Sequence, residues 1–332
     1  MDLLSLLASG AGVNVLADRH HAGLYRSLQL LAGRMGWTLY TPTGLDWFEE
    51  WYWSFGRFTY GDDRLARQFL TWTDRDPEFP DVPINYVTLP QARKMDWAYV
   101  IASVPDNEAG FAKYAAEMDA TYVLQVGNTG QSIDWSRGPL ALVSSEMPIV
   151  GKGVRYHQEM EPIEYREATA IHTAASFVNC MTDMGPCWDI LARASRSIPT
   201  GIYGINNPDG VVKPYSDLLD KMTRVGWGWH DKGQGDGFGH VIHSWAAIGR
   251  PLIGHASHYR GRLAEHFWQD GVTCLDLDRH SVSEVVERVL SISPAEHEQM
   301  CRAIRAEFDV IDYDREAREI AELLGVDLAV AA

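Results

Sequence analysis

The segment Val225–Pro251 places the strongest constraint on the fold of this chain. It begins with VGWGW, whose β-branched and aromatic residues favour a strand. A glycine-rich loop follows over Lys232–Gly239. A helical pattern then runs over about His240–Ile248 and ends at Gly249, a common C-terminal cap. This succession of strand, glycine loop, helix and a further apolar run predicts a nucleotide-binding α/β unit.

The glycine-rich loop is predicted to bind an anion. Glycine residues let backbone amides approach a ligand closely, and the helix N-terminus behind them carries partial positive charge and unpaired N–H groups. A phosphate group is therefore the expected ligand. We expect a nucleotide ligand to be bound by residues of the loop and the helix start, and by Asn206 at the end of a predicted strand at Gly201–Ile205. The loop and helix residues are Lys232, Gly233, Gly235, Gly237, Phe238, Gly239 and His240.

The order of residues in this unit resembles a known signature. Asp236-Gly-Phe-Gly is followed by Ser244, Ala246-Ala247, Gly249 and Pro251. This resembles the donor site of GT-B-fold glycosyltransferases, in which a second acidic residue lies eight positions after the first. The resemblance implies that Asp236 contacts the donor sugar and that position 244 holds the nucleotide ribose. Ser244 departs from the pattern, so the donor stays open between a UDP-sugar and a GDP-sugar.

The resemblance implies an α/β fold with two Rossmann-like domains facing a cleft. Alternating strand and helix patterns agree with it, beginning with a strand at Val13–Ala17 and a helix that carries Leu24, Leu28 and Leu31 on one face. We expect three regions: an acceptor-binding domain over residues 1–165 with an aromatic-rich insertion at 45–80, a nucleotide-sugar-binding domain over 166–292, and terminal helices over 293–332 that could cross back to the first domain.

The loop after the first predicted strand contains candidate catalytic groups. Asp18, His20 and His21 lie where a parallel sheet usually presents its functional residues. Histidine titrates near physiological pH and suits proton transfer. GT-B enzymes that invert the sugar often have a base in this loop. We expect His21, His20 or Asp18 to act on the acceptor hydroxyl; the alternative is a polar helix start.

The stretch Leu45–Tyr60 is dense in aromatic residues without a clear period. Aromatic faces stack on sugars and bases, so Trp47, Trp51 and Trp53 are candidate acceptor contacts. A small satellite core beneath an insertion is the alternative interpretation. Asn128 follows a predicted strand at Thr121–Val126 and is a further candidate acceptor contact.

Composition narrows the class of protein. The formal net charge of −16 argues against broad, nonspecific nucleic-acid binding but allows a local basic patch. Cys180, Cys187, Cys274 and Cys301 show no metal-type spacing, which favours reduced thiols in a cytoplasmic protein. The apolar start lacks a basic region, so we expect no signal peptide. No apolar run approaches the length of a membrane span, so we expect none.

Several histidines fall near the glycine loop: His230, His240, His243, His255 and His258. Such a group suggests a metal, but no carboxylate or cysteine completes a recognisable ligand set in the sequence around the helical pair His240 and His243. We therefore expect no metal cofactor.

The sequence thus predicts a nucleotide-sugar-dependent glycosyltransferase. The acceptor stays open between a small molecule or glycan and a hydroxymethylated base in viral DNA. A sugar-nucleotide epimerase, a phosphorylase and a catalytically silent nucleotide-sugar-binding module are the alternatives.

Overall fold

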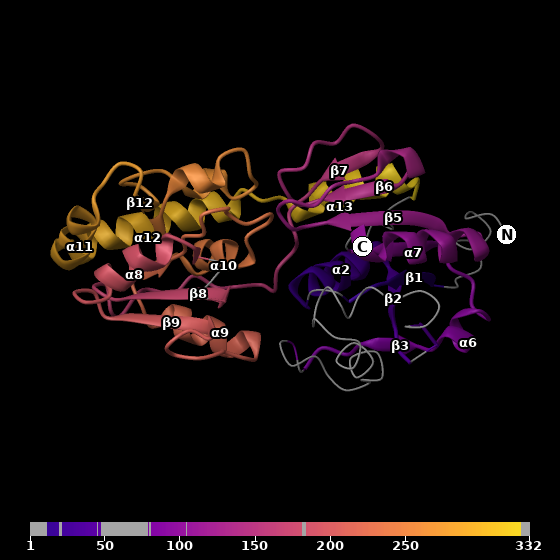
Figure 1. The fold of residues 1–332 in the computed structure, drawn as a ribbon, viewed down its shortest axis with the longest axis horizontal. Helices are drawn as coiled ribbons and strands as arrows, with labels where there is room; N and C mark the ends of the chain where they lie inside the picture. Colours follow the sequence, from indigo (N-terminus) through magenta and orange to yellow (C-terminus); the bar gives the residue numbers. More distant parts are fainter. Residues whose placement is uncertain are drawn as a thin grey trace. The chain divides into compact units, whose positions relative to one another are not determined.

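The computed structural model describes residues 12–19, 22–44, 46–47, 79, 81–103, 105–180 and 184–326. The chain divides into two compact units (Figure 1). Unit 1 consists of Met1–Glu161 together with Tyr313–Ala332, and unit 2 is Pro162–Asp312. Among the described residues, no helix combines the length and the apolar character that a bilayer-spanning segment requires.

Unit 1 contains a seven-stranded parallel sheet in the order β3-β2-β1-β4-β5-β6-β7. The register pairs Val15 of β1 with Leu39 of β2 on one side and with Tyr99 of β4 on the other. The order reverses between β1 and β4, which makes their carboxyl ends a topological switch point. The strands are β1 (Val13–Ala17), β2 (Trp37–Pro42), β3 (Asn85–Val87), β4 (Tyr99–Ala102), β5 (Thr121–Val126), β6 (Leu140–Val143) and β7 (Gly153–Arg155).

Helices cover both faces of this sheet. Along β1, Val15 and Leu16 point to opposite faces, as the two-residue period of a strand requires. Leu16 lies in a core with residues of α7 (Pro105–Glu117), and Val15 lies in a second core with α2 (Ala22–Met35) and α13 (Tyr313–Leu324). A short helix, α6 (Leu89–Ala92), follows β3. The layered arrangement is that of a doubly wound α/β unit.

The helix α13 belongs to unit 1, although it follows unit 2 in the sequence. Its Glu316 accepts a hydrogen bond from the backbone N–H of His157 at 2.7 Å and contacts the His157 ring at 2.6 Å. Asp314 forms an ion pair with Arg34 of α2. The preceding helix, α12 (Pro294–Asp309), belongs to unit 2.

Unit 2 contains a five-stranded parallel sheet in the order β12-β11-β10-β8-β9. Taken in chain order within the unit, this is the 2-1-3-4-5 order of flavodoxin-like sheets, with the switch point between β8 and β10. The strands are β8 (Ala174–Cys180), β9 (Thr200–Ile205), β10 (Trp227–Trp229), β11 (Leu252–Gly254) and β12 (Cys274–Asp276). The helices are α8 (Cys187–Ala194), α9 (Tyr215–Thr223), α10 (His240–Ile248), α11 (Val282–Ser291) and α12.

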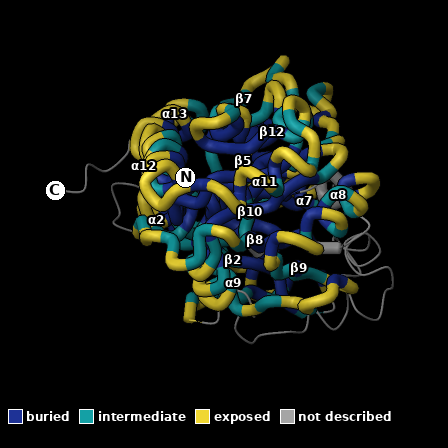
Figure 2. Tube along the Cα trace, turned by 90° about the vertical axis from the view of Figure 1, so that its left-hand side faces the viewer, coloured by how far each residue is buried: buried dark blue, intermediate teal, exposed yellow. Residues whose placement is uncertain are grey.

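The two faces of this second sheet have separate cores. Trp227 and Trp229 of β10 pack with α8 and α11 on one face. Between them, Gly228 faces Trp245 of α10, and a Cβ atom at this position would lie 2.5 Å from the indole ring. Glycine therefore lets α10 approach β10 closely. Figure 2 shows that the strands are largely buried while loops and the outward helix faces are exposed.

The structure confirms the predicted strand, loop and helix around the glycine-rich segment. Capping boxes begin α11 and α12. Two strands, β3 and β7, were not predicted. Between β11 and β12, short 3₁₀ turns occur at Ala256–Tyr259 and Glu265–Phe267.

Candidate functional site

The glycine-rich loop connects β10 to α10 at the carboxyl edge of the second sheet. We call residues Lys232–Gly239 the donor loop. The N–H of Gly235 donates to the carbonyl of Lys232 at 2.8 Å, which closes a turn. Gly235 has a φ of 64°, and a Cβ atom there would collide with the carbonyl of His258. The loop conformation therefore depends on glycine at this position.

An arginine from outside the motif holds the donor loop. The guanidinium of Arg262 donates to the carbonyl of Gln234 at 2.6 Å and to the carbonyl of Asp236. Because Arg262 follows the next strand, β11, the link joins two neighbouring strand ends. Sequence reasoning missed Arg262, since nothing in its neighbourhood marks it as a partner of the loop.

The carboxylate of Asp236 is bound by two basic side chains. Lys232 Nζ lies 2.6 Å from Oδ1, and His230 Nε2 lies 2.5 Å from Oδ2. Burial of the carboxyl acts to raise the pKa of Asp236, but the charges of His230 and Lys232 outweigh it and hold this pKa below its usual range. Asp236 is therefore ionised at neutral pH, and its charge is offset locally.

The start of α10 is suited to an anion. Its N-cap residue, Gly239, has a left-handed conformation with φ 81° and makes no side-chain capping bond. No acidic residue lies in the first turn. The positive end of the helix dipole is thus neither capped nor neutralised by the helix's own residues, and a phosphate fits this end of a helix.

Two predicted donor contacts have structural roles in the core, which corrects the expectation. Phe238 is buried and stacks on His243 with ring centroids 3.9 Å apart. Ser244 is only 1% exposed, and its hydroxyl contacts both the Tyr215 hydroxyl and the His240 carbonyl at 2.8 Å. Neither side chain is presented to a ligand. Tyr215, which sequence reasoning missed, is the polar group directly beside the predicted ribose position.

The remaining predicted donor residues divide into buried and accessible positions. Gly235, Gly237 and Gly239 are buried within the loop. His240 is half-buried at the first position of α10, and Gly233 is exposed. Asn206 is exposed just after β9 and has a left-handed backbone with φ 62°. Lys232, with 17% of its side chain exposed, remains tied to Asp236.

On unit 1, Asp18 lies at the switch point of the first sheet. It is buried, and its Oδ2 accepts a hydrogen bond from the backbone N–H of Ser103 at 2.8 Å. This bond joins the ends of β1 and β4. His20 and His21 lie outside the described residues, as do Trp51 and Trp53. Asn128 is exposed after β5.

The stacking role expected for Trp47 is wrong. Its side chain is 1% exposed and lies in the core with Tyr114 of α7, their ring centroids 5.2 Å apart. The indole N–H donates to the carbonyl of Val87 at 2.9 Å. The ring of Trp47 is therefore packed in the core and its N–H is hydrogen-bonded, so neither is available to an acceptor.

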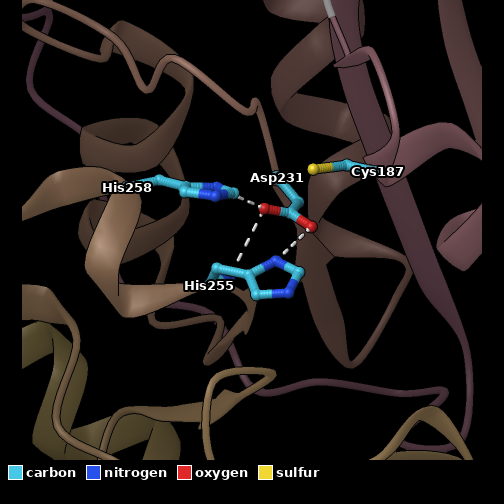
Figure 3. A group of neighbouring side chains, drawn as sticks. All are labelled: Cys187, Asp231, His255 and His258. Atoms are coloured by element: carbon cyan, nitrogen blue, oxygen red, sulfur yellow. Dashed lines mark hydrogen bonds and ion pairs between the residues drawn. The ribbon is translucent and has the colours of Figure 1, made fainter.

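A second cluster of polar side chains lies at the switch point between β8 and β10 (Figure 3). Asp231, directly after His230, is buried between two imidazoles: His255 Nδ1 lies 2.8 Å from one carboxylate oxygen and His258 Nδ1 lies 3.0 Å from the other. The sulfur of Cys187, at the start of α8, lies beside the same carboxylate. The potential ligand atoms of these residues lie within 4.8 Å of one another.

Burial and hydrogen bonding shift the pKa values of three side chains in this cluster. Burial acts to raise the pKa of Asp231, but hydrogen bonds from His255 and His258 lower it below its usual range. The hydrogen bond to Asp231 raises the pKa of His255, and burial raises the pKa of Cys187 to about 12. The sequence expectation concerned only the neighbours of His240 and His243, and the structure brings a cysteine and a carboxylate to His255 and His258 instead. It considered neighbours in sequence, whereas the fold joins three strand ends.

Comparison with known proteins gives a fold and no sequence family. No protein-family model matches the chain, and no curated protein sequence matches it. Among solved structures, an alpha-glucosyltransferase in complex with UDP and a 13-mer DNA containing a HMU base has a TM-score of 0.63 at 11% identity, covering 95% of this chain and 100% of that one.

Two further structures have similar scores over similar lengths. Anabaena Alr3699/HepE in complex with UDP and glucose has a TM-score of 0.60 at 11% identity, over 94% of this chain and 99% of that one. Sucrose-phosphate synthase from Thermosynechococcus elongatus also has a TM-score of 0.60 at 11% identity, over 94% of this chain and 98% of that one. Together with the two parallel sheets, these likenesses show that the chain has the same GT-B fold as these proteins.

Proposed function

We propose that this protein is a glycosyltransferase that moves a sugar from a UDP- or GDP-sugar to an acceptor hydroxyl. One observation carries the proposal: an ionised, charge-offset carboxylate, Asp236, lies beside an uncapped helix N-terminus at the carboxyl edge of the second sheet. The GT-B fold and the resemblance of the donor loop to a donor-site signature agree with it.

The donor loop supplies two kinds of contact that a nucleotide sugar needs. The first-turn amides of α10, together with Lys232 and His240, would stabilise negative charge that develops on the leaving diphosphate. The Asp236 carboxylate would accept hydrogen bonds from sugar hydroxyls. Because the Lys232 ammonium offsets its charge and His230 hydrogen-bonds its second oxygen, Asp236 does not repel the diphosphate as a lone carboxylate would.

The reaction breaks the bond between the sugar's anomeric carbon and the diphosphate oxygen. The acceptor oxygen forms the new bond to that carbon, and the acceptor proton passes to a base or to the departing diphosphate. We propose His21, His20 or Asp18 for contact with the acceptor hydroxyl. The bond between Asp18 and Ser103 makes Asp18 better suited to orienting this loop than to exchanging a proton.

We further propose that transfer needs no metal at the diphosphate. The helix N-terminus and Lys232 provide the positive charge that a divalent ion supplies in other transferases. A small molecule or glycan is the proposed acceptor. The −16 net charge disfavours a long nucleic-acid footprint, so modified DNA is the second candidate.

The test is release of nucleoside diphosphate from UDP-glucose and from a panel of other nucleotide sugars, with and without acceptors. Glycans, small hydroxylated molecules and DNA carrying a hydroxymethylated base form the acceptor panel. Sugar transfer coupled to diphosphate release supports the proposal. Tight nucleotide binding without release, or interconversion of sugars without transfer, would instead identify a binding module or an epimerase.

A further inference from the structure

The cluster formed by Cys187, Asp231, His255 and His258 differs from an ordinary hydrogen-bonded group in its composition. It brings together one thiol, one carboxylate and two imidazoles, which are the side chains that bind Zn²⁺. Among the described residues of the chain, no other group of three or more such side chains meets the same distance limit. The donor set is therefore not a by-product of the many acidic residues in this chain.

The spacing of the atoms suits a single ion. In a tetrahedral zinc site with metal–ligand bonds of about 2.0–2.3 Å, neighbouring ligand atoms lie about 3.5 Å apart. Here the two Nδ1 atoms lie 2.8 and 3.0 Å from the Asp231 oxygens, and all four ligand atoms lie within 4.8 Å of one another. Small side-chain rotations would bring all of them to one ion, since both Nδ1 atoms already face the carboxylate (Figure 3).

We propose that Cys187, Asp231, His255 and His258 bind one Zn²⁺ ion with a structural role. Protein side chains would fill all four positions of the tetrahedron, leaving none for water or substrate, which distinguishes a structural site from a catalytic one. The mixture of a soft thiolate, imidazoles and a carboxylate excludes Mg²⁺ and Ca²⁺, which prefer oxygen ligands.

The position of the site indicates what the ion would stabilise. Cys187 begins α8 after β8, Asp231 follows β10, and His255 follows β11. An ion bound to all of them would fasten three neighbouring strand ends at the switch point of the second sheet. Asp231 also directly precedes Lys232, so the ion would fix the first residue of the donor loop.

The inference is independent of the proposed transfer reaction, because its primary readout is metal content. The full-length protein, purified without chelator or metal-affinity resin, should contain about one zinc per chain by elemental analysis. Metal-free protein titrated with Co²⁺ should develop the visible bands of a tetrahedral site, together with a thiolate-to-cobalt charge-transfer band. Rebinding of Zn²⁺ should raise the Tm.

Two variants and one matched control assign the site. Cys187→Ser should abolish the thiolate-to-cobalt band, and His258→Ala should weaken Zn²⁺ binding by at least about tenfold. Cys301→Ser is the control, because Cys301 is also buried and also lies near an imidazole, 3.5 Å from His297 Nδ1. It should bind Zn²⁺ and Co²⁺ as the natural protein does.

Other results would overturn the proposal. The purified protein could contain no zinc and show no saturable one-to-one uptake of Zn²⁺ or Co²⁺. That result would mean that the four side chains form only a hydrogen-bonded cluster. Equal uptake by the natural protein and His258→Ala would place the metal elsewhere. If Cys187→Ser does not fold, the thiolate-to-cobalt band of the natural protein decides, since its absence excludes a cysteine ligand.

Discussion

The contacts of Asp236 with His230 and Lys232 determine which substitution can test its function. Replacement by alanine would leave Lys232 without its counter-charge and His230 without its hydrogen-bond partner. Breaking a fully buried pair costs about 3–5 kcal/mol, and the 18% exposure of the Asp236 side chain makes the cost smaller here. Asp236→Ala is therefore expected to lower the free energy of unfolding as well as transfer.

Asp236→Asn is the sharper variant. It keeps the shape and a hydrogen-bonding oxygen but removes the charge that would bind sugar hydroxyls. We expect kcat/KM for transfer to fall on the order of 10²-fold. The midpoint of urea unfolding reports any stability change and separates it from the loss of transfer. A kcat/KM equal to that of the natural protein would contradict the role of Asp236.

Lys232→Ala tests whether the lysine charge serves a phosphate. We expect UDP binding to weaken by about tenfold or more while uridine binding changes little, because only UDP carries the diphosphate charge. Isothermal titration calorimetry measures both. Lys221→Ala is the matched control, since Lys221 lies over the Tyr203 ring outside the donor loop. Equal losses for UDP and uridine would argue against a phosphate contact.

His297 gives a pH dependence of stability. It is 1% exposed, its Nε2 lies 2.9 Å from the Gly226 carbonyl, and burial lowers its pKa. Because the folded state holds His297 neutral, the unfolded state binds more protons below an ordinary histidine pKa of about 6.5. The free energy of unfolding should therefore fall as pH decreases below about 6.5.

Urea unfolding between about pH 7.5 and pH 5.5 measures this effect. In His297→Gln the loss of stability over this interval should be smaller than in the natural protein. A variant with the same pH dependence would show that other groups cause the loss.

At the scale of elements, the approach of α10 to β10 depends on Gly228. A methyl group there would meet the Trp245 ring, so Gly228→Ala should lower the free energy of unfolding by about 1–3 kcal/mol. Chemical denaturation measures the change. Gly233→Ala is the matched control, since a Cβ atom added there would have no other atom within 4 Å. Equal effects of the two substitutions would contradict the packing argument.

The elements predicted correctly from the sequence are those with a strong pattern of their own. Val13–Ala17 and Thr121–Val126 are central, buried strands and match β1 and β5. The strands that were missed, β3 and β7, form the two edges of the first sheet and have only three residues each. Their pairing with a neighbouring strand makes them strands, and a short, half-exposed segment carries little hydrophobic signal.

The site was predictable only where its residues are close in sequence. The donor loop was found because glycines, Asp236 and a helix start follow one another. Arg262, Tyr215 and Cys187 join the loop or its surroundings through the fold, so no local pattern marks them. Phe238 and Ser244 belong to the motif, yet their side chains stabilise α10 from within the core.

At the scale of the whole molecule, both units repeat one principle. Each has a parallel sheet whose strand order reverses once, and each places candidate polar residues at that reversal. In unit 1 these include Asp18; in unit 2 they are the zinc-type cluster and the adjacent donor loop. The return of α13 to unit 1 means that the last helix in the described residues stabilises the proposed acceptor-binding unit.

The central claim is that the chain binds a nucleotide sugar through the donor loop and transfers its sugar. The most direct measurement follows nucleoside diphosphate release and sugar incorporation together, in the natural protein and in Asp236→Asn. We expect at least one nucleotide sugar for which both signals rise in equal amounts with the natural protein and fall together in the variant. No release from any UDP- or GDP-sugar, or equal release by the variant, would contradict it.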